Sequence, residues 1–170
     1  MNAIVAVDQN WAIGKGGDQL CYLSADLKRF KELTLGHPVI LGRKTLRTFP
    51  GGRPLKGRSN LILSRTPGFR VIGSQSNRIP GKPYNRVYKT LQNLLRYAPE
   101  DSFVIGGESV YRALLDHCDT VYVTKIAHSF PADVWFPDLD KDPAWQVAHE
   151  EAPLEEKGLT FRYVTYERVR

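Results

Sequence analysis

Three segments of the sequence carry groups that bind phosphate, and each follows an apolar run. They are Val-Ile-Gly-Gly at residues 104–107, Leu-Gly-Arg-Lys-Thr at 41–45 and Leu-Ser-Arg at 63–65. Paired glycines let the backbone approach a ligand closely, while hydroxyls and cations bind phosphate oxygens. A glycine pair before a helix is also common in tight turns, and this one lacks the G-x-G-x-x-G fingerprint of Rossmann folds. Three such segments together predict a site for the phosphates of a dinucleotide.

Asp26 is the carboxylate best placed for acid–base chemistry. It stands one residue before Leu27 and four before Phe30, in the first turn of a predicted amphipathic helix. Acidic side chains are favoured there because they interact with the positive end of the helix dipole. The alternative is a carboxylate in an apolar pocket, whose ionised form would require a cationic or proton-donating ligand. The residues alone are compatible with both interpretations.

Positive charge is concentrated in the middle of the chain. Between Lys28 and Arg112 there are 17 Lys and Arg residues against 4 Asp and Glu, whereas the remainder has 7 against 14. Such a stretch suggests a polyanionic partner, either nucleic acid or a phosphate-rich cofactor. A non-catalytic nucleic-acid-binding module would show strongly salt-dependent binding and no turnover. The predicted strands lack the interleaved aromatic and basic residues expected of a single-strand binder.

The overall composition is typical of one globular domain. The chain has 170 residues, of which 42% are hydrophobic and 25% charged, so it can bury a sizeable core. No apolar run reaches the roughly 20 residues of a membrane span, and the N-terminus has no signal-peptide pattern, so we expect a cytoplasmic protein. Two cysteines and four scattered histidines lack the spacing of a disulfide framework or a metal site. We therefore expect no metal.

Strand-like and helix-like segments alternate along the chain. Apolar and β-branched runs predict strands at residues 2–7, 38–42, 60–64, 102–105, 120–126 and 161–166. Helical spacing predicts a helix that begins at Ser24, as N-cap, and ends at Gly36, with others at 43–47, 90–97 and 108–115. Residues 65–88 are polar, with a loop-like part at 73–84. This order predicts one α/β domain over residues 1–170. Its mostly parallel central sheet has about eight strands and an antiparallel C-terminal edge, flanked by about four helices.

In order and spacing, these segments resemble one family over nearly the whole chain: the dihydrofolate reductases, in their bacterial chromosomal form. Each segment alone is a weak signal, but the ordered set is highly specific. The matching segments are residues 4–14 (IVAVDQNWAIG), 25–27 (ADL) with Phe30 and Lys31, 38–45 (PVILGRKT), 53–60 (RPLKGRSN), 104–107 (VIGG) with Tyr111, 124–126 (TKI) and 136–137 (FP).

The resemblance implies an enzyme that uses NADPH to reduce 7,8-dihydrofolate to 5,6,7,8-tetrahydrofolate for one-carbon metabolism. Hydride would pass to pterin C6 while N5 gains a proton. Asp26 and Thr124 would be the catalytic pair, with Asp26 holding the pyrimidine edge and raising the basicity of N5 while water delivers the proton. Arg58 would bind the α-carboxylate of the glutamate tail. The other implied substrate-binding residues are Ile4, Val5, Leu27, Phe30, Phe49, Leu55 and Ile105.

The same resemblance implies a cofactor site built on the three segments described first. Backbone groups of Ala6 and Ile13 would meet the nicotinamide carboxamide, and the loop at residues 8–23 would close over its ring. Arg43, Ser64 and Arg65 would bind the 2′-phosphate that distinguishes NADPH from NADH. In the family, the bond within the glycine pair is cis. The implied cofactor-binding residues are Ala6, Ile13, Gly14, Gly42, Arg43, Lys44, Thr45, Leu63, Ser64, Arg65, Ile105, Gly106, Gly107, Glu108, Ser109, Val110 and Tyr111.

Two residues depart from what the resemblance would require. Many family members have Trp where this chain has Cys21, so we expect a roomier pocket and an altered folate affinity or rate. Glu108 would repel a pyrophosphate, so we expect it to point outward and interact with the helix dipole.

The nearest enzyme alternative is the fold-related NADPH-dependent pyrimidine reductase of riboflavin synthesis. It would share the cofactor site, but it gives no reason for Asp26 in an apolar pocket or for the Arg58 clamp. The resemblance to dihydrofolate reductases further implies a monomer that binds antifolates such as trimethoprim or methotrexate. It implies no nucleic-acid partner and no membrane partner.

Overall fold

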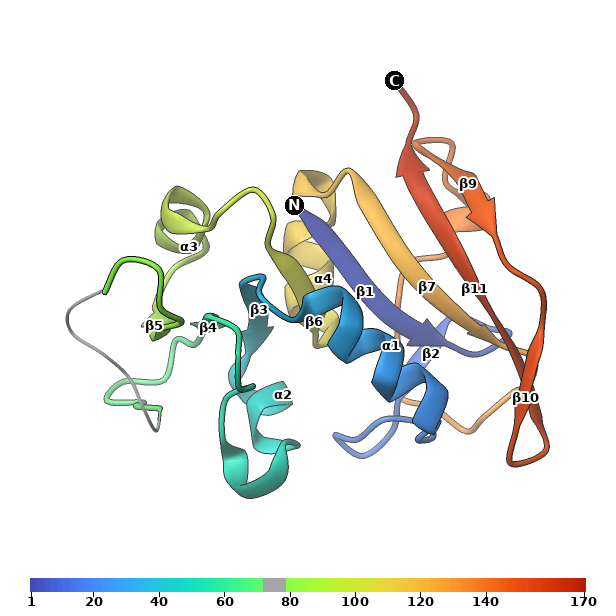
Figure 1. Cartoon of the computed structure of the whole chain (residues 1–170), viewed down its shortest axis with the longest axis horizontal. Coiled ribbons are helices and arrows are strands. Elements are labelled where there is room, and N and C mark those ends of the chain that lie inside the picture. Colours follow the sequence, from blue (N-terminus) through green and yellow to red (C-terminus); the bar gives the residue numbers. More distant parts are fainter. Residues whose placement is uncertain (72–78) are drawn as a thin grey trace.

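A central β-sheet runs through the protein (Figure 1). The computed structural model describes residues 1–71 and 79–170. Within them the sheet contains β1 (Asn2–Val7), β3 (Val39–Gly42), β4 (Asn60–Leu63), β5 (Asn85–Tyr88), β6 (Phe103–Gly106), β7 (Thr120–Ile126), β9 (Trp145–Glu150), β10 (Leu154–Glu156) and β11 (Leu159–Arg168). The spatial order is β10-β11-β7-β1-β6-β3-β4-β5, with β9 also paired to β11. A separate two-stranded sheet consists of β2 (Ala12–Gly14) and β8 (Val134–Trp135).

The sheet has the mixed character that the sequence predicts. All pairings from β7 through β5 are parallel, whereas β11 is antiparallel to β7, β9 and β10. Because β9 and β10 both pair with the edge of β11 that faces away from β7, the described strands occupy eight positions across the sheet. The predicted fold class, with its antiparallel C-terminal edge, is confirmed.

Helices cover both faces of this sheet. In the described part of the chain the α-helices are α1 (Ser24–Thr34), α2 (Arg43–Arg47), α3 (Leu91–Tyr97) and α4 (Glu108–Leu114), and short 3-10 turns lie at Pro50–Gly52, Leu115–His117 and Leu139–Lys141. In Figure 1, α1 crosses the near face of the sheet and α4 lies behind it. All four α-helices lie where helical spacing predicts them.

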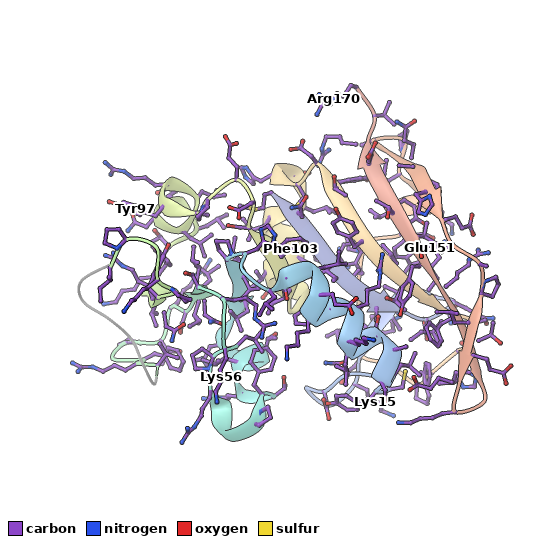
Figure 2. The ribbon with its side chains drawn as sticks, in the orientation of Figure 1. Lys15, Lys56, Tyr97, Phe103, Glu151 and Arg170 are labelled. Carbon is purple, nitrogen blue, oxygen red and sulfur yellow. The ribbon has the colours of Figure 1, made fainter. Side chains whose placement is uncertain are left out.

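The two helical layers follow from the pattern of β1. Val5 and Val7 belong to a core cluster that also contains Leu114 of α4. Ile4, which points to the opposite face, belongs to a second cluster against which Phe30 of α1 packs. A strand with apolar side chains on both faces must be covered on both sides, and side chains fill the space between α1 and the sheet (Figure 2). The layers therefore hold the end of β1 rigidly beside α1.

The sequence does not predict β2, β5, β8, β9 or β10, and β2 lies inside the loop predicted at residues 8–23. β5 lies inside residues 65–88, whose polar composition favours an irregular connection. β8 and β10 have two and three residues, and in β9 only Trp145 of the six residues is buried. Short or exposed strands at a sheet edge need no apolar alternation, so they leave no periodic signal.

The predicted N-cap of α1 is wrong. The cap position is occupied by Leu23, and Ser24 is the first helical residue. The backbone N–H groups of Ser24 and Ala25 instead donate hydrogen bonds to the carboxylate of Glu156. A partner 132 positions away cannot be recognised from the local sequence on which capping rules rest.

β6, β3 and β4 are neighbours in the sheet although they are separated in sequence. They run parallel, so their carboxyl ends lie at one edge. The chain continues from these ends into the glycine pair at 106–107, the segment at 42–45 and the segment at 64–65. The three phosphate-binding segments of the sequence therefore meet at one place, at the edge where ligands bind in open α/β sheets.

The first part of the loop predicted at residues 73–84 lies outside the described residues. In residues 1–71 and 79–170, no helix has the length and apolar character that crossing a membrane requires.

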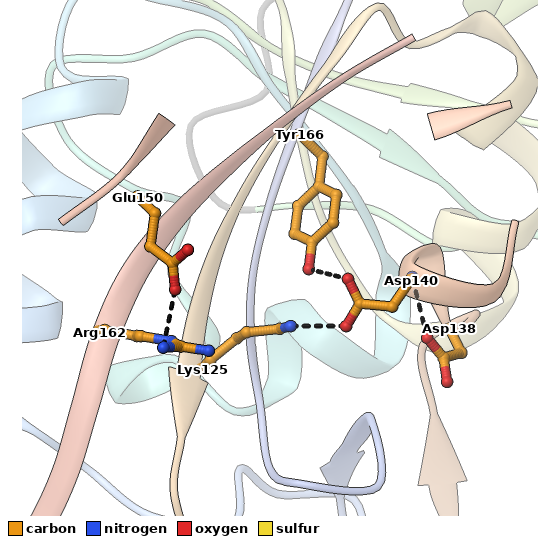
Figure 3. A network of polar contacts seen from close by, with 6 residues as sticks. All are labelled: Lys125, Asp138, Asp140, Glu150, Arg162 and Tyr166. Atoms are coloured by element: carbon orange, nitrogen blue, oxygen red, sulfur yellow. Dashed lines mark hydrogen bonds and ion pairs between the residues drawn. The ribbon is translucent and has the colours of Figure 1, made fainter. Parts of the chain in front are cut away.

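A polar network joins β7 to the turn before β9 (Figure 3). Lys125 Nζ lies 2.6 Å from one oxygen of Asp140, and the hydroxyl of the buried Tyr166 donates to the other at 2.7 Å. Arg162 and Glu150 form a neighbouring ion pair at 2.7 Å. Burial raises the pKa of Asp140, but the hydrogen bonds from Lys125 and Tyr166 outweigh it and hold this pKa below its ordinary value. The folded protein therefore stabilises the carboxylate.

Asp140→Asn is expected to lower the free energy of unfolding by about 1 kcal/mol near neutral pH, because it removes a partly exposed ion pair. Folding lowers the pKa of Asp140, so its contribution is complete above the unfolded pKa of about 3.9 and is lost as pH falls through the folded pKa. Melting temperatures of parent and variant should differ near neutral pH and converge in strong acid. Asp116→Asn, on an exposed side chain, is the control. A difference that persists in strong acid would rule out this origin.

Candidate active site

One large cleft collects every residue that the sequence assigns to a substrate or cofactor. Its volume is about 1160 Å³. A pocket for one small ligand has roughly 300–1,000 Å³, so this cleft is large enough for two ligands side by side. It opens at the carboxyl ends of β1, β3, β4 and β6. The predicted residues that line it are Ile4, Val5, Ala6, Ile13, Gly14, Asp26, Leu27, Phe30, Gly42, Arg43, Lys44, Thr45, Phe49, Leu55, Arg58, Leu63, Ser64, Arg65, Ile105, Gly106, Gly107, Glu108, Ser109, Val110, Tyr111 and Thr124.

Asp26 and Thr124 meet in this cleft. Asp26 lies in the first turn of α1 and is half-buried, while Thr124 lies on β7 and is 3% exposed. The Thr124 hydroxyl donates a hydrogen bond of 2.5 Å to Asp26 Oδ1. The hydroxyl fixes one oxygen of the carboxylate, so the other oxygen is available to a ligand in the cleft. Both interpretations of Asp26 therefore apply, because it is a first-turn acid that also faces an apolar pocket.

The surroundings of Asp26 make its ionised form unfavourable. Burial raises its pKa, the Thr124 hydrogen bond and the charge of Arg29 act in the opposite direction, and the charge of Glu156 adds to the rise. The net effect is a raised pKa. Such a carboxyl gains most from a ligand that presents N–H donors or a positive charge to it.

Arg58 is a buried cation that lines the same cleft. It is 7% exposed, its Nε donates to the Lys56 carbonyl at 2.9 Å, and its Nη1 donates to Thr34 Oγ1 at 3.1 Å. Burial lowers its pKa. No carboxylate in residues 1–71 and 79–170 lies within ion-pair distance of it. A fixed guanidinium of this kind suits bidentate binding of a ligand carboxylate.

Apolar side chains line the same cleft as Asp26 and Arg58. Phe30, Phe49 and Leu55 are partly buried and pack against the core cluster that contains Ile4 of β1, so the walls are continuous with the core. Leu27 lines the same cleft but is 48% exposed, which places it at the rim. This combination suits a flat aromatic ligand held at each end by one charged group.

The glycine pair forms a close backbone surface at the end of β6. Its peptide bond is cis, as the resemblance implies. A Cβ at Gly107 would lie 3.3 Å from Thr45 Oγ1, and one at Gly106 would lie 3.4 Å from the Tyr111 ring. A Cβ at Gly42, on the neighbouring strand, would lie 3.1 Å from a methyl group of Val110. Glycine at these positions therefore keeps β3, β6 and α4 close together.

Cations flank this glycine surface. Arg43, Lys44 and Arg65 line the cleft, and none of them forms an ion pair within the described part of the chain. The Ser64 hydroxyl accepts from the Thr66 backbone N–H at 3.2 Å, so its own O–H remains able to donate to a ligand. These groups can neutralise phosphate charge at the edge formed by β3, β4 and β6.

Two predicted residues have structural partners of their own. The Tyr111 hydroxyl donates to the Ile4 carbonyl at 2.7 Å, and burial raises the pKa of Tyr111 well above its ordinary value. It therefore stays neutral and anchors α4 to β1. Glu108 accepts a hydrogen bond of 2.7 Å from the Trp135 backbone N–H and lies 4.0 Å from Arg112. These partners explain how a carboxylate can stand beside an anion site.

The loop at residues 8–23 lies along the same cleft. Its start is fixed by the buried Asp8 carboxylate, which accepts from the backbone N–H groups of Ala12 and Phe130 at 2.9 Å each. Cys21, the departure from the family, lines the cleft, and burial followed by the charge of Asp26 raises its pKa. The expected roomier pocket at Cys21 stays a prediction.

Sequence reasoning missed several lining residues. Residues 17–20 and Tyr22 lie in the loop predicted to close over a ligand, so that prediction could have named them individually. Thr48, Pro50 and Thr66 are next to predicted residues in the sequence. Val134 lies in β8, for which the sequence shows no strand pattern. The lining residues to which the sequence assigned no place in the site are Gly17, Asp18, Gln19, Leu20, Tyr22, Lys31, Thr48, Pro50, Thr66, Leu91, Ala113, Ile126 and Val134.

Comparison with known proteins agrees with this geometry. A family model described as dihydrofolate reductase matches residues 1–168. The chain belongs to the dihydrofolate reductase family. It is 34% identical to the dihydrofolate reductase of Bacillus subtilis (strain 168) over 168 residues, which covers 97% of this chain and 92% of that protein. It is 33% identical to the dihydrofolate reductase of Staphylococcus haemolyticus over 171 residues, which covers 100% of this chain and 96% of that protein.

A solved dihydrofolate reductase has the same fold. The Enterococcus faecalis enzyme, complexed with NADP(H) and RAB-propyl, superimposes with a TM-score of 0.80 at 30% sequence identity. The alignment covers 99% of this chain and 96% of the other. The resemblance that the sequence indicated is therefore confirmed for the family and for the fold.

Proposed function

We propose that this chain reduces 7,8-dihydrofolate to 5,6,7,8-tetrahydrofolate with NADPH, by hydride transfer to C6 and protonation of N5, and so supplies one-carbon metabolism. The observation that carries the proposal is the Asp26–Thr124 pair, which shares one cleft with the glycine pair at 106–107. One end of the cleft suits a pterin and the other a pyrophosphate. Membership of the dihydrofolate reductase family supports the same reaction.

The residues at the edge formed by β3, β4 and β6 fit NADPH. Gly42, Gly106 and Gly107 leave no side chain between the backbone and a ligand, and Lys44 with Thr45 stands beside them. When bound, NADPH supplies the hydride. Arg43, Ser64 and Arg65 would hold the 2′-phosphate, and backbone groups of Ala6 and Ile13 would hold the nicotinamide carboxamide. The structural relative from Enterococcus faecalis, solved with NADP(H), supports this cofactor.

Asp26 would hold the pyrimidine edge of the substrate. Its free oxygen would accept from the N–H groups of that edge, and the Thr124 hydroxyl would keep the carboxylate oriented. A charge held at this edge raises the basicity of N5 through the conjugated ring, so water can deliver the proton. Arg58 would bind the α-carboxylate of the tail, which fixes the substrate at both ends and aligns C6 for hydride transfer. The loop at residues 8–23 would exclude bulk water.

Replacing both Arg43 and Arg65 by Ala is expected to lower kcat/KM for NADPH by about 100-fold while kcat/KM for NADH changes little, because only NADPH carries the 2′-phosphate. Steady-state rates with each cofactor give the ratio. Arg47→Ala is a matched control on the same helix, since Arg47 is exposed and outside the cleft. Equal losses of kcat/KM with NADPH and NADH would show that these cations do not bind the 2′-phosphate.

The proposal extends to features beyond the reaction. We infer that residues 1–170 fold as one unit, that the protein is a cytoplasmic monomer, and that antifolates such as trimethoprim or methotrexate bind in place of the substrate. The family of the chain supports these inferences. Analytical ultracentrifugation and competition for the dihydrofolate site would test the monomer and the antifolates.

Substrate-dependent oxidation of NADPH tests the proposed function. The purified protein should consume NADPH rapidly with 7,8-dihydrofolate and not with the ribosylamino-pyrimidine used in riboflavin synthesis. Activity with the pyrimidine alone would assign the chain to the related pyrimidine reductases instead. Salt-dependent binding of nucleic acid without turnover would favour the non-catalytic alternative.

A further inference from the structure

Glu156 provides the N-terminal cap that α1 lacks in its own sequence. One of its carboxylate oxygens accepts from the Ser24 backbone N–H at 2.6 Å, and the other accepts from the Ala25 N–H at 3.0 Å. These bonds lower the pKa of Glu156, so it is ionised at neutral pH. The charge of a carboxylate also interacts favourably with the positive end of a helix. The residue that follows these two N–H groups is Asp26.

The β10–β11 hairpin, which carries Glu156, contacts the chain on both sides of Leu23. Lys157, the next residue, donates from Nζ to the carbonyl of Tyr22 at 3.1 Å. Lys157 and Gly158 both have positive φ, of 53° and 74°, which forms the tight turn between β10 and β11. Leu23 itself is buried in a cluster with side chains of β11. In Figure 1 the turn between β10 and β11 lies beside the N-terminal end of α1.

The same hairpin fixes the partner of Asp26. Tyr163 of β11 pairs with Thr124 of β7 in the antiparallel ladder. Arg29, one turn along α1 from Asp26, lies 4.0 Å from the centre of the Tyr163 ring and 3.8 Å from Glu151. Glu151 belongs to the connection between β9 and β10 (Figure 2). β11 and the connection between β9 and β10 therefore hold both halves of the Asp26–Thr124 contact.

We propose that Glu156 is a positioning residue for the reaction: through the first turn of α1 it sets the place and the electrostatic environment of Asp26. This inference rests on the proposed function, because it assigns Glu156 a part in the same site. Glu156 does not line the cleft, so it acts through α1 and not on the substrate.

Several charged or titratable groups act on Asp26 from the surrounding elements. Arg29 lies on its own helix and lowers its pKa, and Thr124 on β7 lowers it through a hydrogen bond. The negative charge of Glu156, on β10, raises it. Cys21 in the loop, Tyr111 on α4 and Tyr163 on β11 also interact electrostatically with Asp26, and their protonated forms are neutral. Removing the charge of Glu156 should therefore lower the pKa of Asp26.

The test uses Glu156→Gln, Glu156→Asp and the matched control Glu155→Gln. Glu155 is the exposed neighbour on the same strand, so the control removes the same charge without touching α1. Single-turnover reduction of dihydrofolate is followed across pH. Glu156→Gln is expected to slow hydride transfer about fivefold and to displace the pH profile to lower pH. Glu156→Asp should keep the profile of the parent and part of its rate, and Glu155→Gln should match the parent in both.

A second readout needs no turnover. Carbon NMR titration of the Asp26 carboxyl in the ligand-free protein should give a lower pKa in Glu156→Gln than in the parent. Circular dichroism checks that each variant is folded. A folded Glu156→Gln with the rate, profile and Asp26 pKa of the parent would overturn the inference, as would an equal displacement by Glu155→Gln. An inactive parent would overturn the proposed function instead, and the titration would still decide the role of Glu156.

Discussion

Asp26→Asn is expected to slow the reduction of dihydrofolate by about 100- to 1,000-fold near neutral pH. The amide keeps the shape of the side chain and its bond from Thr124, but it carries no charge and presents an N–H group where the substrate also presents donors. The conjugated ring then loses the interaction that raises the basicity of N5. Single-turnover rates with NADPH, measured across pH, report the effect on the chemical step. Glu32→Gln, on an exposed side chain of the same helix, is the control and should behave as the parent.

The same substitution should stabilise the protein. Burial raises the pKa of Asp26 in the folded state, so ionisation of this group favours unfolding at any pH above its unfolded pKa of about 3.9. This loss of stability grows as pH rises towards the pKa of Asp26 in the folded state and is complete above that pKa. Asp26→Asn removes this loss, so its melting temperature should exceed that of the parent near neutral pH and approach it in acid. Lower activity together with higher stability is typical of a functional group held in unfavourable surroundings. A variant that is both less active and less stable near neutral pH would indicate a structural role.

Arg58→Lys is expected to raise KM for dihydrofolate by about 100-fold with a much smaller change in kcat, because a point charge replaces a bidentate donor. Lys is chosen because it keeps a cation at this buried position. Arg58 also supports Lys56 and Thr34, so circular dichroism and melting temperature are measured alongside.

A truncated substrate separates binding of the tail from a structural effect. A dihydropterin without the aminobenzoylglutamate tail has no carboxylate for Arg58 to bind. Parent and Arg58→Lys should therefore reduce it with equal kcat/KM, although both should do so poorly. If the variant loses the same factor with the truncated and the complete substrate, Arg58 does not bind the tail.

Much of the fold could be predicted because its central strands are buried on both faces. β1 and β7 have the predicted bounds, because β-branched and apolar residues are concentrated in both segments. α2 also has the predicted bounds, although it has only five residues, because Gly42 and the turn after Thr48 delimit it. The exposed edge was predicted only in part, because β9 and β10 have no apolar face to leave a pattern.

The candidate site was predictable as a set of residues but not as an arrangement. Local sequence located the phosphate-binding segments, and the family resemblance supplied roles for Asp26, Thr124 and Arg58. The spatial order β6-β3-β4 brings those segments together. This order depends on which strands pair, so it cannot be predicted from the local sequence of any one segment. The cap on α1 from Glu156 could not be predicted for the same reason, since it depends on a contact between distant parts of the chain.

Transfer of deuterium from NADPH that carries deuterium at both hydrogen positions of nicotinamide C4 tests the central claim most directly. The purified protein is incubated with the labelled cofactor and 7,8-dihydrofolate, and the product is examined by NMR. The account predicts tetrahydrofolate with deuterium at C6, formed quickly by the parent and at least about 100-fold more slowly by Asp26→Asn near neutral pH. Tetrahydrofolate without the label, or labelled product formed equally fast by Asp26→Asn, would contradict it.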